Sequence, residues 1–499
     1  MHGLARLVVV LLPLVALGGC FQQSALSTPP EPRCDFVSIP LAVDLPEGSE
    51  PNRADTLATQ IRQRNGRLQP IPRDALEPEL AQVVPSPPNE PPTSLFMSGG
   101  SLNGAFGAGF LDEWSTQSNA SGQAGLPDFH TVTGISTGAI LATFAFIDRT
   151  APTVGENGYG LDHESRILDP FINSRRSKTD FRNLFRAVRH GALADLSRLN
   201  AALARELTDD VLNQVDARYH QGRQLLVGVV DVDTGQAVGL DLTEMAHRRR
   251  IEPARRDALL GCYTRAIVAS SSAPLAALPV FIDNRMYVDG GVRFGTFSHE
   301  VLPGEKELSI AAGLPSNEQP HVFVIVNGDL LTDAQCGKLR RERERLCTDE
   351  SPTGGTDGAH RRWNLPRLAL RSNGILQDQV QIMSVERIGQ ASRLAGKRFH
   401  PVFMKPDVSK HPFTFQNHSR FSGTNDCAGW RNEDKARDRP VQFFPRYMHC
   451  LIDYGRARAR VERWDRALNP PAAPAEPPTV GPKPNPPISP PVATKPAGN

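Results

Sequence analysis

The placement of proline constrains the fold of this 499-residue chain more than any other feature. Residues 21–93 hold 14 of the 43 prolines and residues 470–499 hold 12, whereas the long stretch 94–469 holds only 16. Proline fixes φ and removes a backbone donor, so such segments do not build helices or the interior of a sheet. We therefore expect a Pro-rich tether over residues 20–93, a folded region, and a disordered Pro-rich tail over residues 470–499.

Composition excludes three classes of protein. The chain has 56 Lys and Arg against 54 Asp and Glu, a net charge of +2, which lacks the basic bias of a nucleic-acid binder. Hydrophobic residues make up 39% and charged residues 22% of the chain, and the mean hydropathy is −0.34. These values exclude a polytopic membrane protein and a wholly disordered chain.

The amino terminus is typical of an export signal. One basic residue, Arg6, precedes an apolar run over residues 7–17 that is too short to span a bilayer, and small residues then lead to Cys20. This segment resembles the lipobox of bacterial lipoproteins, which implies a signal peptide over residues 1–19, lipidation of Cys20 and anchoring to the cell envelope. Phe21 at the next position implies that the protein is anchored in the outer membrane. The alternative is an ordinary cleaved signal with a chance cysteine.

Six further cysteines could pair in an oxidising compartment, and their 15 possible pairings cannot be separated by sequence. They are Cys34, Cys262, Cys336, Cys347, Cys427 and Cys450. We expect Cys262, which lies in an apolar helical run, to be a buried free thiol. Cys336 and Cys347 can meet only if the chain turns between them.

Between the Pro-rich flanks, short apolar runs alternate with helical patterns. The expected strands cover residues 94–97, 129–133, 225–230, 286–288 and 322–326. The expected helices include residues 137–147, 193–215, 265–270, 374–395 and 447–467. This alternation predicts an α/β layer fold with a largely parallel central sheet. We place a catalytic domain over residues 94–330 and a helical extension, packed on that domain, over residues 331–469.

The segment Gly134-Ile135-Ser136-Thr137-Gly138 matches a nucleophile turn between a strand and a helix. A nucleophilic serine there needs glycines on either side because the backbones crowd together. The helix that follows directs N–H groups toward developing negative charge. A plain glycine-rich turn is the alternative.

A second glycine-rich segment, residues 98–104 (SGGSLNG), follows the first expected strand. Acyl transfer requires backbone donors aimed at an oxyanion, and the amides of Gly99, Gly100 and Ser101 are candidates. A nucleotide-binding loop is the alternative, but the segment has neither a GxGxxG pattern nor a terminal Lys-Ser/Thr pair.

The third candidate is Asp289, followed by two glycines at the end of an expected strand. A carboxylate there can accept the proton of a serine within hydrogen-bond reach. An Asp-Gly turn between strands is the alternative.

The order of these motifs resembles the patatin-like phospholipase family. The segments 227–235 (VGVVDVDTG) and 269–274 (ASSSAP) resemble the same family, and the likeness covers about residues 94–330, with a weaker likeness near 374–395. The resemblance implies a three-layer α/β/α fold and hydrolysis of lipid acyl esters through an acyl-enzyme. It implies Ser136 as nucleophile, Asp289 as general base, and an oxyanion hole from Gly99, Gly100 and Ser101.

The resemblance also implies that no cofactor, metal or calcium is needed, and no paired His or Cys spacing suggests a metal site. The chain departs from the family pattern at Ser101, where a third glycine is usual, and at Asn103, where Lys or Arg is usual. The segment 292–297 after the Asp-Gly-Gly motif also lacks the usual Asn and Pro character. These departures put rate and headgroup preference in question.

Two other functions stay open at this stage. One is a non-catalytic envelope lipoprotein that uses the fold as a binding module. The other is an esterase with a Ser-His-Asp triad, in which His299 or His321 would be the histidine.

Overall fold

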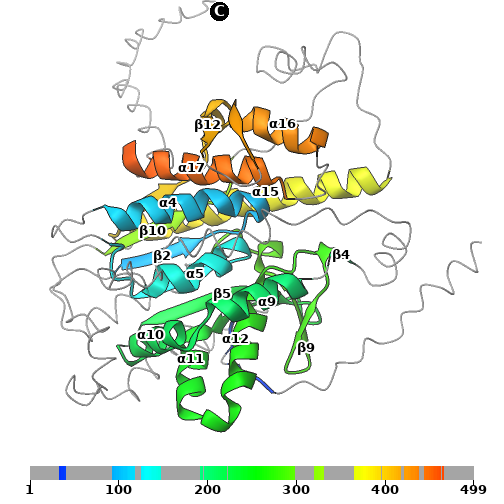
Figure 1. The fold of residues 1–499 in the computed structure, drawn as a ribbon. Helices are drawn as coiled ribbons and strands as arrows, with labels where there is room; N and C mark the ends of the chain where they lie inside the picture. Colours follow the sequence, from blue (N-terminus) through cyan, green and yellow to red (C-terminus); the bar gives the residue numbers. More distant parts are fainter. Residues whose placement is uncertain are drawn as a thin grey trace, which may run out of the picture. The chain divides into compact units, whose positions relative to one another are not determined.

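The computed structural model describes the parts of the chain that form the sheet and its helices (Figure 1). They are residues 33–36, 38–40, 93–117, 125–147, 192–194, 196–221, 223–297, 320–330, 365–394, 396–416, 421–437, 443–461 and 464–465. The predictions for the signal peptide, Cys20, His299, Cys336, Cys347 and the Pro-rich tail lie outside the described residues. Among the residues described, none of the helices has both the length and the apolar character to cross a bilayer.

A mixed central sheet organises the fold, with the strand order β1-β6-β5-β3-β2-β10-β11. Five neighbouring strands are parallel: β5 (Gln224–Asp231), β3 (Thr131–Gly134), β2 (Thr93–Met97), β10 (His321–Ile325) and β11 (Arg398–Val402). Antiparallel strands complete one side: β6 (Ala237–Asp241), β1 (Ser38–Pro40), β9 (Arg285–Asp289) and β8 (Val280–Ile282). The prediction of an α/β fold with a largely parallel sheet is confirmed.

Helices flank this sheet (Figure 1). On the chain they are α4 (Gly104–Thr116), α5 (Thr137–Ile147), α9 (Ser197–Glu206), α10 (Asp209–His220), α11 (Leu242–Ile251), α12 (Arg256–Ser270), α15 (Leu365–Leu394), α16 (Cys427–Arg437) and α17 (Pro445–Val461). Every residue of α5 is buried, as expected for a helix that is apolar on all sides and lies within the core.

Short elements join and extend these layers. Four are 3₁₀ turns: η3 (Ser101–Asn103), η5 (Pro253–Arg255), η6 (Gly290–Val292) and η7 (Pro406–Lys410). Two small sheets pair β4 (Ala192–Ala194) with β7 (Leu275–Ala277), and β12 (Pro412–Phe415) with β13 (Gly423–Asp426).

Strand β9 occupies the edge of β5 that β3 leaves free. β3 pairs with β5 only as far as Gly134, which lies opposite Val227. From there β9 pairs with the rest of β5, and Asp289 lies opposite Val229. Asp289 therefore lies directly beyond the carboxyl end of β3, beside the turn that contains Ser136.

The helix expected over residues 193–215 is interrupted in the structure. Strand β4 comes first, and α9 and α10 are then separate helices. Thr208 ends the run because its hydroxyl accepts a hydrogen bond from the Val211 N–H and caps α10. The uniform spacing of apolar residues concealed this break, because both helices direct apolar faces to the core.

The expectation that Cys262 is a free thiol is wrong. Cys262 in α12 forms a disulfide with Cys34, and their Cα atoms lie 5.6 Å apart. Cys34 is fully buried, and its N–H donates to Asp283 Oδ1 at 2.6 Å. Four residues later β1 pairs with β6 at the sheet edge, so part of the segment predicted as a tether belongs to the folded structure.

Helix α17 packs closely on α4 through two glycines (Figure 1). A Cβ atom at Gly109 would lie 1.9 Å from the Ile452 carbonyl oxygen, and one at Gly455 would lie 2.2 Å from the Phe106 carbonyl oxygen. These distances require glycine at both positions. The disulfide between Cys427 and Cys450 then joins α16 to α17.

Candidate active site

Ser136 occupies a tight turn between β3 and α5. Its φ of 55° lies in the left-handed region, which is strained for a residue with a side chain and is typical of functional turns. A Cβ at Gly134 would lie 2.3 Å from the Gly138 carbonyl oxygen, and one at Gly138 would lie 2.6 Å from the Met97 carbonyl oxygen. The two glycines predicted to flank the nucleophile are therefore required by the close approach of β2, β3 and α5.

A serine at the end of α12 supports this turn. The Ser136 N–H donates to Ser270 Oγ at 3.0 Å, and the Ser270 hydroxyl donates to the Gly228 carbonyl oxygen at 2.7 Å. The Ser271 hydroxyl lies 3.3 Å from the Ser136 carbonyl oxygen, which accepts from it. The contact of this run of serines with Ser136 could not be predicted from the sequence, where the run carries only a family likeness.

Asp289 is the acidic side chain that the fold brings to Ser136. It is buried and accepts a hydrogen bond from the Gly291 N–H at 2.7 Å. Burial raises the pKa of Asp289 to about 6, while hydrogen bonds from the Gly291 N–H and the Ser136 side chain act in the lowering direction. A carboxylate with this pKa is suited to accept a proton near neutral pH.

The structure does not bring His321 to this site. His321 begins β10 and lies opposite Thr93, whereas Ser136 follows the other end of the neighbouring strands. The four residues of strand between these two ends correspond to a separation of about 13 Å. His321 Nδ1 instead lies 3.1 Å from His400 Nε2. Among the described residues no histidine hydrogen-bonds to Ser136 or Asp289, so a triad through His321 is not assembled.

The glycine-rich loop after β2 lies against the same turn. An ideal Cβ on Gly99 would lie 3.2 Å from Ser136 Cβ, and one on Gly100 would lie 1.8 Å from the Asn327 carbonyl oxygen. The Gly99 N–H donates to the Gly295 carbonyl oxygen at 3.3 Å. Within the described residues the Gly100 N–H has no acceptor. The loop thus lies beside the nucleophile at Gly99, and the next amide of the predicted set, that of Gly100, has no hydrogen-bond partner among the described residues.

Ser101 has a φ of 52°, in the left-handed region where the family usually has glycine. For a residue with a Cβ atom this conformation costs about 1–2 kcal/mol. The substitution therefore keeps the loop conformation and adds strain to it. Asn103 follows as the last residue of η3, and its N–H donates to the Gly100 carbonyl oxygen at 3.0 Å.

Two residues that sequence analysis did not identify hold this loop. The Asn327 N–H donates to Ser98 Oγ at 2.8 Å, and Asn327 Nδ2 donates to the Ser98 carbonyl oxygen at 2.7 Å. Gln381 in α15 also donates to Ser98 Oγ, at 3.3 Å. Both are more than 200 residues from the loop, so no local spacing could have found them.

Comparison with known families agrees with this geometry. A family model described as patatin-like phospholipase matches residues 95–298, which include the glycine-rich loop, Ser136 and Asp289. This chain contains a patatin-like phospholipase domain. This match suggests a lipid acyl hydrolase activity, and the predicted three-layer α/β/α fold agrees with it. No curated protein matches the chain.

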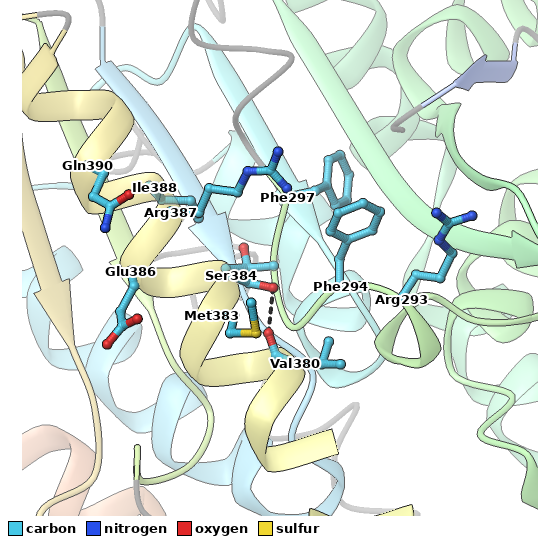
Figure 2. Close-up of a pocket in the computed structure, with 11 residues that line it drawn as sticks. Arg293, Phe294, Phe297, Val380, Met383, Ser384, Glu386, Arg387, Ile388 and Gln390 are labelled. Carbon is cyan, nitrogen blue, oxygen red and sulfur yellow. Dashed lines mark hydrogen bonds between the residues drawn. The ribbon is translucent and has the colours of Figure 1, made fainter. Parts of the chain in front are cut away.

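A pocket of about 410 Å³ lies between α15 and the segment that follows Asp289 in the patatin-like domain (Figure 2). Its lining combines apolar and charged side chains: Arg293, Phe294, Thr296, Phe297, Val380, Met383, Ser384, Glu386, Arg387, Ile388 and Gln390. Figure 2 shows the Phe294 and Phe297 rings facing the helix across the pocket.

Gly295 joins this pocket to the glycine-rich loop. Its N–H donates to Ser384 Oγ at 3.0 Å, and its carbonyl oxygen accepts from the Gly99 N–H. A Cβ at Gly295 would lie 2.4 Å from Gln381 Cα, so α15 passes directly against this backbone. One wall of the pocket is therefore hydrogen-bonded to the loop beside Ser136.

Proposed function

We propose that this protein hydrolyses acyl esters of lipids with a Ser136–Asp289 dyad through an acyl-enzyme. The observation that carries the proposal is the position of Asp289, which is far from Ser136 in sequence but lies beside the Ser136 turn because β9 replaces β3 beside β5. The Ser136 side chain is one of the groups that act to lower the pKa of Asp289. The match to the patatin-like phospholipase model supports lipid acyl hydrolysis as the reaction class.

In the first step, Asp289 accepts the proton of the Ser136 hydroxyl while Oγ attacks the ester carbonyl carbon. The electron pair of the carbonyl bond moves to its oxygen, and the resulting oxyanion needs donors near Ser136. Collapse of this intermediate breaks the bond to the alcohol, which takes the proton from Asp289. Water then attacks the acyl-enzyme by the same route and gives up its proton to Asp289. The bond between the acyl carbon and Ser136 Oγ breaks, Oγ takes the proton from Asp289, and the fatty acid is released.

We assign the Gly100 amide as the first oxyanion donor, because it has no acceptor among the residues described and lies in the loop beside Ser136. The Gly99 amide joins it when its 3.3 Å bond to the Gly295 carbonyl oxygen opens. Ser101 follows in the same loop and completes the set predicted from the sequence.

The pocket between α15 and residues 293–297 suits an amphiphilic substrate. Val380, Met383 and Phe294 offer apolar surface to an acyl chain, and Arg387 offers positive charge to a phosphate headgroup. We propose phospholipids, lysophospholipids or neutral acyl esters as substrates. No cofactor is required for this reaction, so activity should be the same with and without a chelator.

We further propose that the protein is exported and anchored by a lipidated Cys20 to the cell envelope, in the outer membrane. The Cys34–Cys262 and Cys427–Cys450 disulfides support an oxidising compartment, where such bonds persist. The division into tether, catalytic domain, helical extension and tail stays a prediction.

Hydrolysis by the full chain, purified in detergent, tests the proposal. Wild type, Ser136→Ala and Asp289→Asn are each checked for folding and assayed on a short-chain p-nitrophenyl ester and on phospholipid micelles. Ser409→Ala, at an exposed position in η7, is the matched control. We expect turnover by wild type and the control alone.

The second candidate is a binding module without catalysis, and the strained Ser101 together with the occupied Gly99 amide favours it. Folded wild type that binds lipid vesicles but turns over neither substrate would support this candidate and overturn the dyad.

A further inference from the structure

A cluster away from Ser136 carries a second inference. Asp216 and His220 lie one turn apart on α10, and His247 lies on the adjacent helix α11. Asp216 Oδ1 is 2.8 Å from His247 Nδ1 and 3.5 Å from His220 Nε2. All three potential ligand atoms lie within 4.8 Å of one another.

The cluster is buried. The Asp216 side chain is fully buried, and only 10% of the His220 side chain and 17% of the His247 side chain are exposed. A carboxylate buried in this way needs positive charge or hydrogen-bond donors around it. Here two imidazoles and the Arg250 guanidinium lie beside it.

His220 is incompletely satisfied in this arrangement. Its Nε2 atom is buried and has no hydrogen-bond partner in the described part of the chain, although it faces the Asp216 carboxylate. An unpaired buried nitrogen costs free energy, and the separation of 3.5 Å is too long to compensate for it. A cation between the imidazole nitrogen and the carboxylate oxygen would satisfy both groups.

We propose that Asp216 Oδ1, His220 Nε2 and His247 Nδ1 bind a divalent transition-metal ion, with Zn²⁺ as the reference ion and water as the fourth ligand. Imidazole and carboxylate are common ligands of Zn²⁺, with bonds of about 2.0–2.2 Å. The ligand atoms of such a tetrahedral site lie about 3.4 Å apart. The separation of 3.5 Å between His220 Nε2 and Asp216 Oδ1 is close to that value. The separation of 2.8 Å between His247 Nδ1 and Asp216 Oδ1 is that of a hydrogen bond, which the metal would replace.

Neighbouring side chains would orient two of the ligands. Arg250 Nε lies 3.0 Å from Asp216 Oδ2 and forms an ion pair with it, although this oxygen has no hydrogen-bond partner among the described residues. The Tyr219 ring stacks on the His247 ring with centroids 4.3 Å apart and an angle of 10°. Outer partners of this kind fix ligand geometry and contribute to affinity.

The role of the ion would be to join α10 to α11. α10 packs against both α11 and α5, and α5 is the helix that begins immediately after Ser136. A metal crosslink between α10 and α11 would therefore stabilise the scaffold behind the nucleophile turn. It would contribute to folding and not to the chemical step, so its test does not depend on activity.

The test uses the untagged full chain in detergent, treated with a chelator and then dialysed against Zn²⁺ at pH 7.5. Elemental analysis measures bound zinc, and thermal unfolding is followed with and without the ion. We expect one zinc per chain and an increase in Tm of roughly 3–4 °C at a free Zn²⁺ concentration of 100 Kd. His220→Gln and His247→Gln should each lose the bound zinc and the increase in Tm.

His411→Gln is the matched control, because His411 Nε2 lies 2.8 Å from Asp453 Oδ2 but that pair is not part of the cluster. It should keep the bound zinc. Equal zinc binding by wild type and both cluster variants, or no increase in Tm with Zn²⁺, would overturn the proposal in favour of a simple ion-pair network. If both variants fail to fold, the visible absorption spectrum of wild type with bound Co²⁺ is the deciding measurement. Tetrahedral Co²⁺ bands that disappear when Zn²⁺ is added would support the proposal, and the absence of such bands would overturn it.

Discussion

Replacing Asp289 by asparagine should abolish hydrolysis and yet stabilise the protein at neutral pH. Burial raises the pKa of Asp289 from its ordinary value of 3.8 to about 6, so the folded state binds a proton more tightly than the unfolded state. The stability contributed by the protonated carboxyl is fully present below pH 3.8 and is lost as the pH rises through 6. The side chain of the asparagine variant would carry no charge at any of these pH values and would not suffer this loss.

The magnitude follows from the shift. Two pKa units correspond to about 3 kcal/mol, which is the penalty for the ionised Asp289 at pH 8. At pH 4.5 the penalty falls to about 1 kcal/mol, because the folded-state carboxyl is then protonated. The stability of Asp289→Asn relative to wild type should therefore increase by about 2 kcal/mol between pH 4.5 and pH 8.

Urea unfolding of both proteins at pH 4.5, 6 and 8 measures this difference. Glu113→Gln is a control of opposite sign, since the Arg460 hydrogen bond outweighs burial and lowers the pKa of Glu113. That variant should lose stability relative to wild type at pH 8 and lose less at pH 4.5. A pH-independent difference between Asp289→Asn and wild type would refute the reasoning about burial. The wild-type kcat/KM should also fall about tenfold per pH unit below 6.

Three further predictions concern the scaffold of the site. Gly100→Ala should prevent folding or activity because its Cβ would lie 1.8 Å from a backbone oxygen. Gly374→Ala is the control: this residue of α15 has open space around it, so the substitution should raise Tm. Ser270→Ala should lower kcat more than it raises KM, because the Ser136 N–H loses its acceptor, and Ser270→Thr should restore part of kcat. Cys34→Ser should lower the free energy of unfolding by about 2–5 kcal/mol, measured in urea, through loss of a disulfide.

Local patterns predicted much of the fold and the parts of the site. The expected strand 94–97, the helix 137–147 and the strand 286–288 agree with β2, α5 and β9 in position. The glycines beside Ser136 could be predicted because a strand-to-helix turn with an exposed nucleophile requires them locally. The order of the three motifs also predicted the family that the comparison then found.

Contacts between distant residues could not be predicted in this way. Nothing near Cys262 indicates that Cys34 would cover it, and an apolar helix made a free thiol the expected state. The cluster of Asp216, His220 and His247 could not be predicted because His247 comes from the next helix, and only Asp216 and His220 share a turn.

The sequence by itself determined the α/β fold and the residue types for acyl transfer, because strand and helix periodicities and glycine turns are local properties. Only the tertiary structure decided which groups meet. β9 takes the edge of β5 that β3 leaves, and this pairing places Asp289 beside Ser136 and buries it. Strand pairing also accounts for three other features of the site. They are the raised pKa of Asp289, the hydrogen bond of the Gly99 amide, and the position of His321 at the far end of the sheet. Strand pairing depends on packing across the whole domain, which no local window of sequence contains.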